Sequence, residues 1–236
     1  MDEEKVTVAA ESVEPTTAPA APNIGIEQRM AKIVSTVFTP FSIPFLAFLL
    51  LLLVSYLRML PITYKLIILG IVYTFTILTP SLAILAYCKI NKLSTKDLTQ
   101  KQHRYLPFLL TIMSYVCCLL LMRQMNIPWY MTGIILAALL SQVVCIVLNL
   151  FWKVSEHMAG AGAIVGGLIA FSELFGYNPI WWLCLIIFIA GMLGSARISL
   201  GHHNLSEVLG GFAIGLICTL VVLHPYLGMP FSFLLF

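Results

Sequence analysis

Long apolar runs separated by short polar stretches make up the chain from residue 38 onward. Most of these runs approach the length of about 20 residues that a helix needs to cross the hydrocarbon core of a bilayer. Proline stands at the start of several runs, where a missing N–H costs little. The pattern predicts seven apolar segments, at 38–57, 63–88, 105–122, 128–151, 158–175, 179–196 and 207–223.

We therefore predict an all-α fold, a polytopic transmembrane helical bundle of about six to seven spans, with residues 38–236 as one transmembrane domain. Residues 1–22 are rich in Glu, Thr, Ala and Pro and lack large apolar side chains, which predicts a disordered tail and argues against a signal peptide. Between them, residues 23–37 carry an apolar stripe at helical spacing, which predicts an interfacial amphipathic helix.

Two features inside the runs predict how the helices bend and pack. Pro80 lies within the second run and should kink it. The pairs Gly162–Gly166 and Gly211–Gly215 have the spacing that lets two helix backbones approach closely. We therefore expect the fifth and seventh segments to pack against each other, and we assign these glycines a structural role and not a catalytic one.

Composition excludes a soluble domain, because 60% of the residues are hydrophobic and only 10% are charged. We expect membrane lipids as surroundings and no nucleic-acid partner; the oligomeric state is not predicted. The six cysteines lie in or at the edges of apolar runs and form no Cys-x-x-Cys pair. They are typical of small buried hydrophobes and not of a disulfide framework or a zinc site.

Two polar clusters at the ends of apolar runs carry the candidate chemistry, because charged groups are costly near hydrocarbon. The first is Ser155-Glu156-His157, and the second runs from Arg197 through His203 to Glu207. A guanidinium offers a forked donor for phosphoryl oxygens, and an imidazole held by a carboxylate is a nucleophile or base. The pattern favours phosphate chemistry.

Counting the seven predicted spans places both clusters, and the polar loop at 89–104, on the same membrane face as the N-terminal tail. The stretch ARISLGHHNLSEVLGG resembles the third signature of the type-2 phosphatidic acid phosphatase superfamily. Ser155-Glu156-His157 is similar to its second signature, usually Pro-Ser-Gly-His. Both signatures thus lie at the expected common face.

The resemblance, which covers roughly residues 95–224, implies a role for each matching residue. His203 is expected to attack phosphorus and form a phosphohistidine, Glu207 to align it, and His157 to protonate the leaving oxygen. The phosphate ligands are expected to be Arg197, Ser155, Arg104, Lys101 and Lys153. The superfamily's reaction uses no metal or other cofactor, so none is expected here.

This chain departs from the superfamily's signatures at several positions. The first signature is a lysine, six residues, then Arg-Pro, whereas here Asp97 stands where the lysine belongs before Arg104. Glu156 replaces the usual glycine, where a carboxylate repels phosphate unless it is protonated or paired, for example with Lys153. Glu207 replaces the usual aspartate.

Other interpretations remain open. His203 and Glu207, four residues apart, also fit a helix-surface pair without chemistry. Metal binding by the two signature histidines and their carboxylates is a further alternative. The leading prediction is a membrane phosphatase for a lipid-linked phosphate or diphosphate. The alternative is a non-catalytic relative that binds or transports a lipid phosphate.

Location is predicted from the distribution of basic residues. We expect an integral protein of a bacterial cytoplasmic membrane. Ten of the 13 Lys and Arg residues lie on the motif-bearing face and three on the other. Four of these basic residues, Lys101, Arg104, Lys153 and Arg197, belong to the candidate phosphate site and would be present in either orientation. Without them the count is six to three, which favours a site facing the cytoplasm. Related enzymes generally act at the opposite surface, so both orientations stay open.

Overall fold

The computed structural model describes residues 39, 41–54, 56–90 and 105–224, and all regular structure in these ranges is helical. The predicted tail at 1–22 and the predicted interfacial helix at 23–37 lie outside the described residues. So do the first-signature residues Lys101 and Arg104. The elements, in chain order, are α2 (Ile43–Val54), η1 (Tyr56–Met59), α3 (Ile62–Tyr73), η2 (Thr74–Leu78), α4 (Thr79–Ile90), α5 (Tyr105–Gln124), α6 (Trp129–Leu148), α7 (Glu156–Phe175), α8 (Ile180–Ser199) and α9 (Leu205–Leu223).

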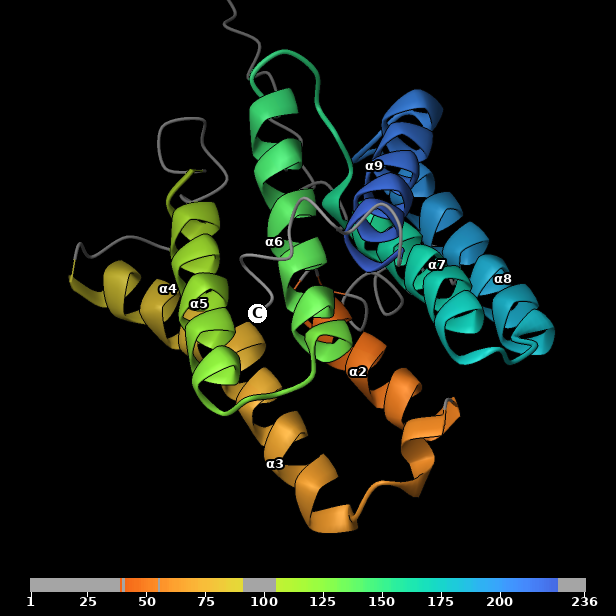
Figure 1. The fold of residues 1–236 in the computed structure, drawn as a ribbon. Helices are drawn as coiled ribbons and strands as arrows, with labels where there is room; N and C mark the ends of the chain where they lie inside the picture. The colour runs from red at the N-terminus through yellow and green to blue at the C-terminus, as the bar shows by residue number, and fades with distance from the viewer. Residues whose placement is uncertain (1–38, 40, 55, 91–104, 225–236) are drawn as a thin grey trace, which may run out of the picture.

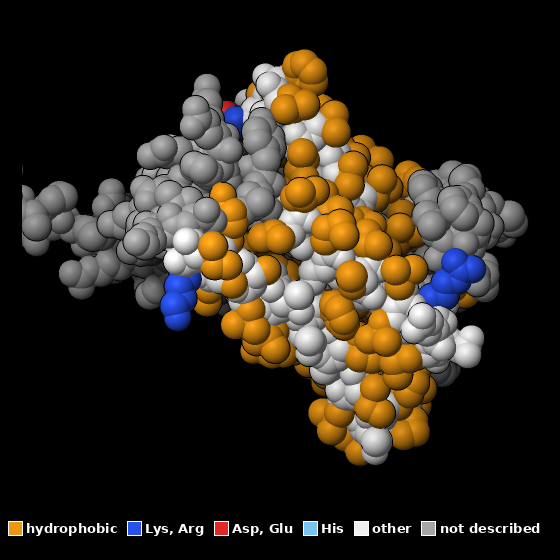
Figure 2. All heavy atoms as spheres, turned by 90° about the vertical axis from the view of Figure 1, so that its left-hand side faces the viewer, with side chains coloured by type: hydrophobic (Ala, Val, Ile, Leu, Met, Phe, Trp, Pro, Cys, Tyr) orange, Lys and Arg blue, Asp and Glu red, His pale blue; other side chains and the backbone are white. Residues whose placement is uncertain are grey.

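Six of the described helical segments are long and apolar enough to cross a membrane. They are Ile62–Ile90, Pro107–Gln124, Trp129–Leu148, Glu156–Phe175, Ile180–Ser199 and Leu205–Leu223. This confirms the predicted transmembrane helical bundle. Large apolar side chains such as Leu66, Trp181 and Phe188 are exposed on these helices, as expected where lipid is the solvent. Figure 2 shows one such face, covered with hydrophobic side chains and with Lys and Arg only toward its edges.

The first predicted segment, 38–57, does not form a full-length span. Its helix α2 has 12 residues, a length of about 18 Å, against a hydrocarbon core of about 30 Å. The helix begins only after a turn in which the Ser42 N–H donates to the carbonyl of Thr39. It is followed by the 3-10 turn η1, and Pro61 then starts α3. Local turn formation at both ends therefore shortens what looks like one apolar run.

The second predicted span is a bent helix formed by α3, η2 and α4. The turn η2 is a π-helix that ends two residues before Pro80. Proline has no N–H to donate, and its ring clashes with the carbonyl four residues earlier in a regular α-helix. The hydroxyl of Ser114 on α5 donates to the carbonyl of Phe75 in this turn. Figure 1 shows α4 leaving in a different direction from α3. The predicted kink is confirmed, and a neighbouring helix satisfies part of the altered backbone.

Helices α7 and α9 form the tightest pair in the structure, as the glycine spacing predicts. A Cβ atom added at Gly162 would overlap the carbonyl oxygen of Phe212, and one added at Gly215 would overlap that of Ala159. At Gly166 the same added atom would lie 2.8 Å from the carbonyl oxygen of Leu216. The two backbones are therefore in direct contact along several turns. Helix α8 covers α7 and α9 through a small core cluster that includes Met158, Leu193 and Val208.

Candidate active site

The turn between α6 and α7 meets the turn between α8 and α9, so the second and third signatures lie together. The ammonium of Lys153 donates to the backbone carbonyl of His202 at 2.6 Å. The backbone N–H of Ser155 donates to the carbonyl of Glu207 at 3.3 Å. These bonds join segments about fifty residues apart in sequence. The two described clusters therefore lie together at one end of the helices.

Glycine at position 201 lets the chain leave α8 and return as α9. Gly201 has a φ of +65°, in the left-handed region that other residues adopt at a cost. The N–H of His202 donates to the carbonyl of Arg197 at 3.2 Å, which closes the helix end. Helix α8 therefore runs to Ser199, beyond the predicted end at residue 196, because this closure extends its last turn. Arg197 lies inside that turn, where a cation is favoured by the helix dipole.

Helix α9 begins at Leu205, two residues before the predicted start at Glu207. Asn204 is the N-cap, and Glu207 is the third helical residue. The two form a capping box, in which each side chain accepts a hydrogen bond from the other residue's backbone N–H. The bond from the Asn204 N–H to Glu207 Oε2 is 3.3 Å long. Sequence reasoning missed Asn204, although the spacing Asn-x-x-Glu is a recognisable helix start.

The same carboxylate oxygen of Glu207 also holds His203. His203 Nδ1 donates to Glu207 Oε2 at 2.8 Å. Only 7% of the His203 side chain and 13% of the Glu207 side chain are exposed, which is unlike a solvated surface pair. Because the carboxylate can only accept, the proton lies on Nδ1 and the lone pair lies on Nε2. The imidazole is therefore oriented and its tautomer is selected.

Burial and two nearby positive charges lower the pKa of His203. Burial lowers its pKa below the ordinary value of 6.5, and the positive charges of Arg197 and Lys153 lower it further. The hydrogen bond and charge of Glu207 act in the opposite direction without reversing the shift. The pKa of the neighbouring His202 is also lowered, by burial and by the same two cations. At neutral pH His203 therefore carries an unprotonated Nε2 beside two cations.

Three second-signature residues occupy the start of α7. Ser155 is its N-cap and is fully buried, and its Oγ has no hydrogen-bond partner among the described residues. The carboxylate of Glu156, the first helical residue, lies near enough to Arg197 for the two charges to interact. His157 is half-buried in the first turn of α7.

The remaining titratable residues lie apart from this cluster or do not gather into a metal site. In the part of the chain that the structure describes, no three His, Cys, Asp or Glu side chains are grouped to hold a metal ion. His224, at the C-terminal end of α9, pairs with Glu173 of α7 at 3.0 Å.

The cysteines are free thiols. Cys117 and Cys184 are exposed on spanning helices, contrary to the expectation of burial for all six.

Comparison with known proteins returned no matching family model, no matching curated protein and no matching solved structure. The chemistry of the site therefore has to be inferred from the geometry of its residues. That geometry consists of a neutral, carboxylate-oriented histidine, two nearby cations and two helix N-termini at one end of a membrane-embedded bundle. Such a set can hold an anion and direct a nucleophile at it.

Proposed function

We propose that this protein is a membrane phosphatase that removes phosphate from a lipid-linked phosphate or diphosphate through a phosphohistidine intermediate, as a divergent member of the type-2 phosphatidic acid phosphatase superfamily. Candidate substrates are a polyprenyl diphosphate, phosphatidate or a lipid A phosphate. The observation that carries the proposal is the 2.8 Å bond from His203 Nδ1 to Glu207 Oε2, next to the charges of Arg197 and Lys153.

In the proposed reaction, His203 Nε2 attacks phosphorus while the bond between phosphorus and the lipid oxygen breaks. His157 gives its proton to the departing oxygen, so that the lipid leaves as an alcohol or a monophosphate. Arg197 and Lys153 balance the charge that builds on the phosphoryl oxygens. Water, losing a proton to His157, then attacks the phosphohistidine, and inorganic phosphate and free His203 result. Glu207 stabilises the imidazolium character that develops at His203 during attack.

A second candidate function is binding or transport of a lipid phosphate without hydrolysis. One observation favours it. The charge of Glu156 acts on Arg197, where it competes with a phosphate for the guanidinium.

Phosphate release distinguishes the two. Detergent-purified protein is assayed against a panel of lipid phosphates, beside a His203→Ala variant. We expect release by the wild type and a loss of several orders of magnitude in the variant, with unchanged recovery and thermal unfolding. An equally active His203→Ala protein would exclude the phosphohistidine. Inactive wild type that still binds the lipid phosphate would leave the binding function.

We propose the bacterial cytoplasmic membrane as the location, and the orientation depends on α2. If α2 crosses the bilayer, the basic-residue count favours a cytoplasm-facing site, as predicted. If α2 turns back, Lys5, Arg29 and Lys32 move to the opposite face. The count then becomes seven to six, or three to six without the four basic residues among the predicted phosphate ligands, and favours an extracytoplasmic site. A Ser206→Cys variant, treated in intact cells with a thiol reagent that does not cross the membrane, decides between them. Labelling at this position indicates an extracytoplasmic site, and protection indicates a cytoplasmic one.

A further inference from the structure

The turn between α6 and α7, residues 149–155, carries two of the predicted phosphate ligands, Lys153 and Ser155. Two of its apolar side chains, Leu150 and Phe151, are exposed and so do not hold it in place. Where the turn lies against α9 is therefore set by its other side chains and by its backbone.

Asn149 closes the turn across Lys153. It is the C-cap of α6, and its Oδ1 accepts a hydrogen bond from the N–H of Val154 at 2.8 Å. An asparagine that bonds to the backbone a few residues further on fixes a turn in this way. Val154 is itself buried, so the bond joins two places that packing already holds. Because Lys153 directly precedes Val154, this bond sets the direction of its backbone.

Trp152 joins the turn to α9. A Cβ atom added at Gly210 would overlap the ring of Trp152, and one added at Gly211 would overlap the carbonyl oxygen of Ser155. The two glycines therefore admit the indole ring and the backbone of the turn against the first turns of α9. Trp152 directly precedes Lys153, so the lysine backbone is held on both sides.

The ammonium group of Lys153 depends on this anchoring. The side chain is exposed, and its four-carbon stem is flexible. Its Nζ donates to the carbonyl of His202 at 2.6 Å, next to His203. An ammonium has three N–H donors, so the carbonyl takes one and phosphoryl oxygens can take the others. Because the stem has many rotamers, such a group stays in one place only where its backbone is fixed.

We infer that Asn149 and Trp152 are positioning residues, which act through Lys153 and hold its ammonium beside His203. The inference rests on the proposed function, in which that ammonium meets the phosphoryl oxygens. Neither Asn149 nor Trp152 is itself a phosphate ligand. Both should therefore lose their effect on the reaction when the lysine is absent.

A double-mutant cycle tests this dependence on Lys153, with phosphatidate in mixed micelles as the substrate. Asn149→Ala removes the turn bond without changing a charge, and it should lower kcat/KM about tenfold. Lys153→Met should lower kcat/KM at least as far. Adding Asn149→Ala to Lys153→Met should cause no further loss. A second tenfold loss in the double variant would overturn the inference, because Asn149 would then act independently of the lysine.

Asn178 supplies the matched control at the other end of α7. Its Oδ1 accepts from the N–H of Ile180 at 3.0 Å, so Asn178→Ala removes the same kind of bond from a different turn. Both alanine variants should lower the thermal unfolding temperature alike, but only Asn149→Ala should lower kcat/KM. Equal losses of activity would show that the turn bond has a structural role alone, and the inference would be wrong.

The reactivity of His203 gives a readout that needs no turnover. Diethylpyrocarbonate reacts with the neutral imidazole, and fragment mass spectrometry reports the reaction at His203 as a function of pH. Burial lowers the pKa of His203, and the charges of Arg197 and Lys153 lower it further. Glu207 acts in the opposite direction. Asn149→Ala should therefore move the midpoint upward, toward 6.5, by no more than Lys153→Met does. An unchanged midpoint would contradict the positioning role.

Trp152 provides a second pair of variants. Trp152→Ala removes the ring from Gly210, whereas Trp152→Phe keeps a flat ring there. The alanine variant should repeat both effects of Asn149→Ala, and Trp152→Phe should recover most of kcat/KM and of the His203 midpoint. Failure of Trp152→Phe to restore either would exclude the ring as an anchor. Should Asn149→Ala fail to fold, this pair decides.

The two proposals fail in distinguishable ways. If the wild type releases no phosphate, the phosphatase reaction is wrong, and the His203 midpoint still tests the positioning. If the wild type is active and Asn149→Ala changes neither kcat/KM nor the midpoint, the reaction stands and the positioning is wrong.

Discussion

Helix α7 presents small residues on two sides, and the two sides behave differently. Toward α9, Gly162 and Gly166 bring two backbones into contact. Toward α2 and α6, Ala163 and Gly167 border an open cavity. At Gly160, by contrast, a side chain of α2 fills the space beside α7. Helices α2 and α6 also pack against α3 and α5 in a shared apolar core.

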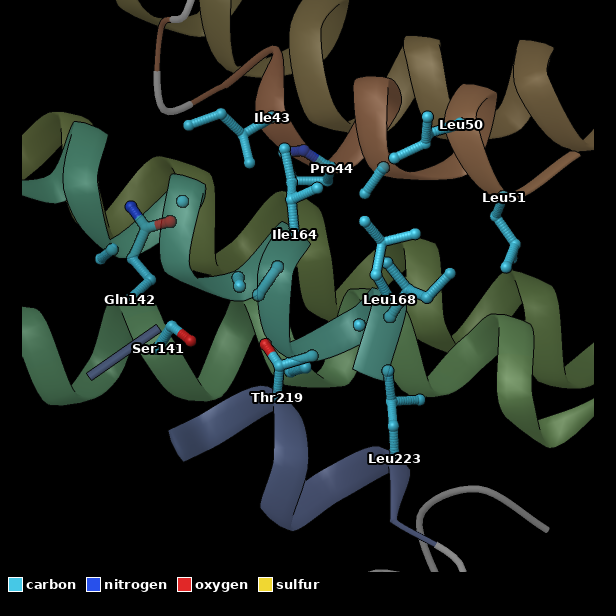
Figure 3. A pocket seen from close by; sticks show the side chains of 18 of the residues that line it. Ile43, Pro44, Leu50, Leu51, Ser141, Gln142, Ile164, Leu168, Thr219 and Leu223 are labelled. Carbon is cyan, nitrogen blue, oxygen red and sulfur yellow. The ribbon is translucent and has the colours of Figure 1, made fainter. Parts of the chain in front are cut away.

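The two sides also divide the chemistry of the candidate site. The α9 side sets the polar geometry, because contact between the backbones holds Ser155 against Glu207. The cavity side is mostly apolar and carries none of the candidate catalytic residues (Figure 3). Changes on the α9 side should therefore affect every substrate equally.

Enlarging Gly215 should have the largest effect. A Cβ there overlaps the backbone carbonyl of Ala159, which cannot turn aside. We expect Gly215→Val to destabilise the fold by on the order of 4 kcal/mol or more, so that little folded protein is recovered. The measurement is thermal unfolding after size-exclusion chromatography in detergent.

The control is Gly167→Ala on α7, on the side of that helix that borders the cavity. A Cβ at Gly167 lies 3.8 Å from Thr219 Cγ2, an ordinary contact. Because alanine is the better helix former, this variant should be unchanged or more stable by up to about 1 kcal/mol. Similar destabilisation by both substitutions would show that the two sides are not packed differently.

The next largest effect is expected at Glu207. Glu207→Gln keeps an acceptor near His203 but removes the charge, and should lower kcat about 10²- to 10⁴-fold by analogy with triad carboxylates. Glu207→Asp should be tolerated better, although it shortens the reach to both His203 and Asn204. The loss should be the same for long-chain and short-chain phosphates. A loss confined to long chains would assign Glu207 to chain binding instead.

The pH dependence of kcat/KM should report the charges around His203. Because the neutral imidazole attacks and its pKa is lowered, activity should fall only at pH values below 6.5. Lys153 lowers this pKa, so Lys153→Met should move the acid limb upward, toward 6.5. Glu207 raises it, so Glu207→Gln should move the limb further down. An acid limb that neither substitution moves would belong to another group.

The smallest effect is expected at Gly201. A Cβ at this position meets nothing within 4 Å, so only its backbone conformation opposes substitution. Gly201→Ala should cost about 1–2 kcal/mol of stability, and Gly201→Asn should cost less. Thermal unfolding of the three proteins measures the difference. An unchanged Gly201→Ala protein would show that the α8–α9 turn tolerates another conformation.

Several elements were predictable because their causes are local in sequence. The spanning helices follow from run length and composition, and the bend before Pro80 follows from a missing N–H. The short α2 was not predicted, because its ends are set by turns that an apolar count ignores. The start of α9 was misplaced by two residues although Asn204 and Glu207 already formed a readable capping box.

The sequence by itself determined that the chain forms membrane helices, that α7 and α9 can approach closely, and that Arg197, His203 and Glu207 stand at one end of the bundle. These properties follow from hydrophobicity, residue size and helical spacing. Only the tertiary structure decided that Glu156 lies near Arg197, that Ser155 is buried, and that a cavity runs along α7. Those depend on how the helices pack against one another, which is not encoded in any one segment.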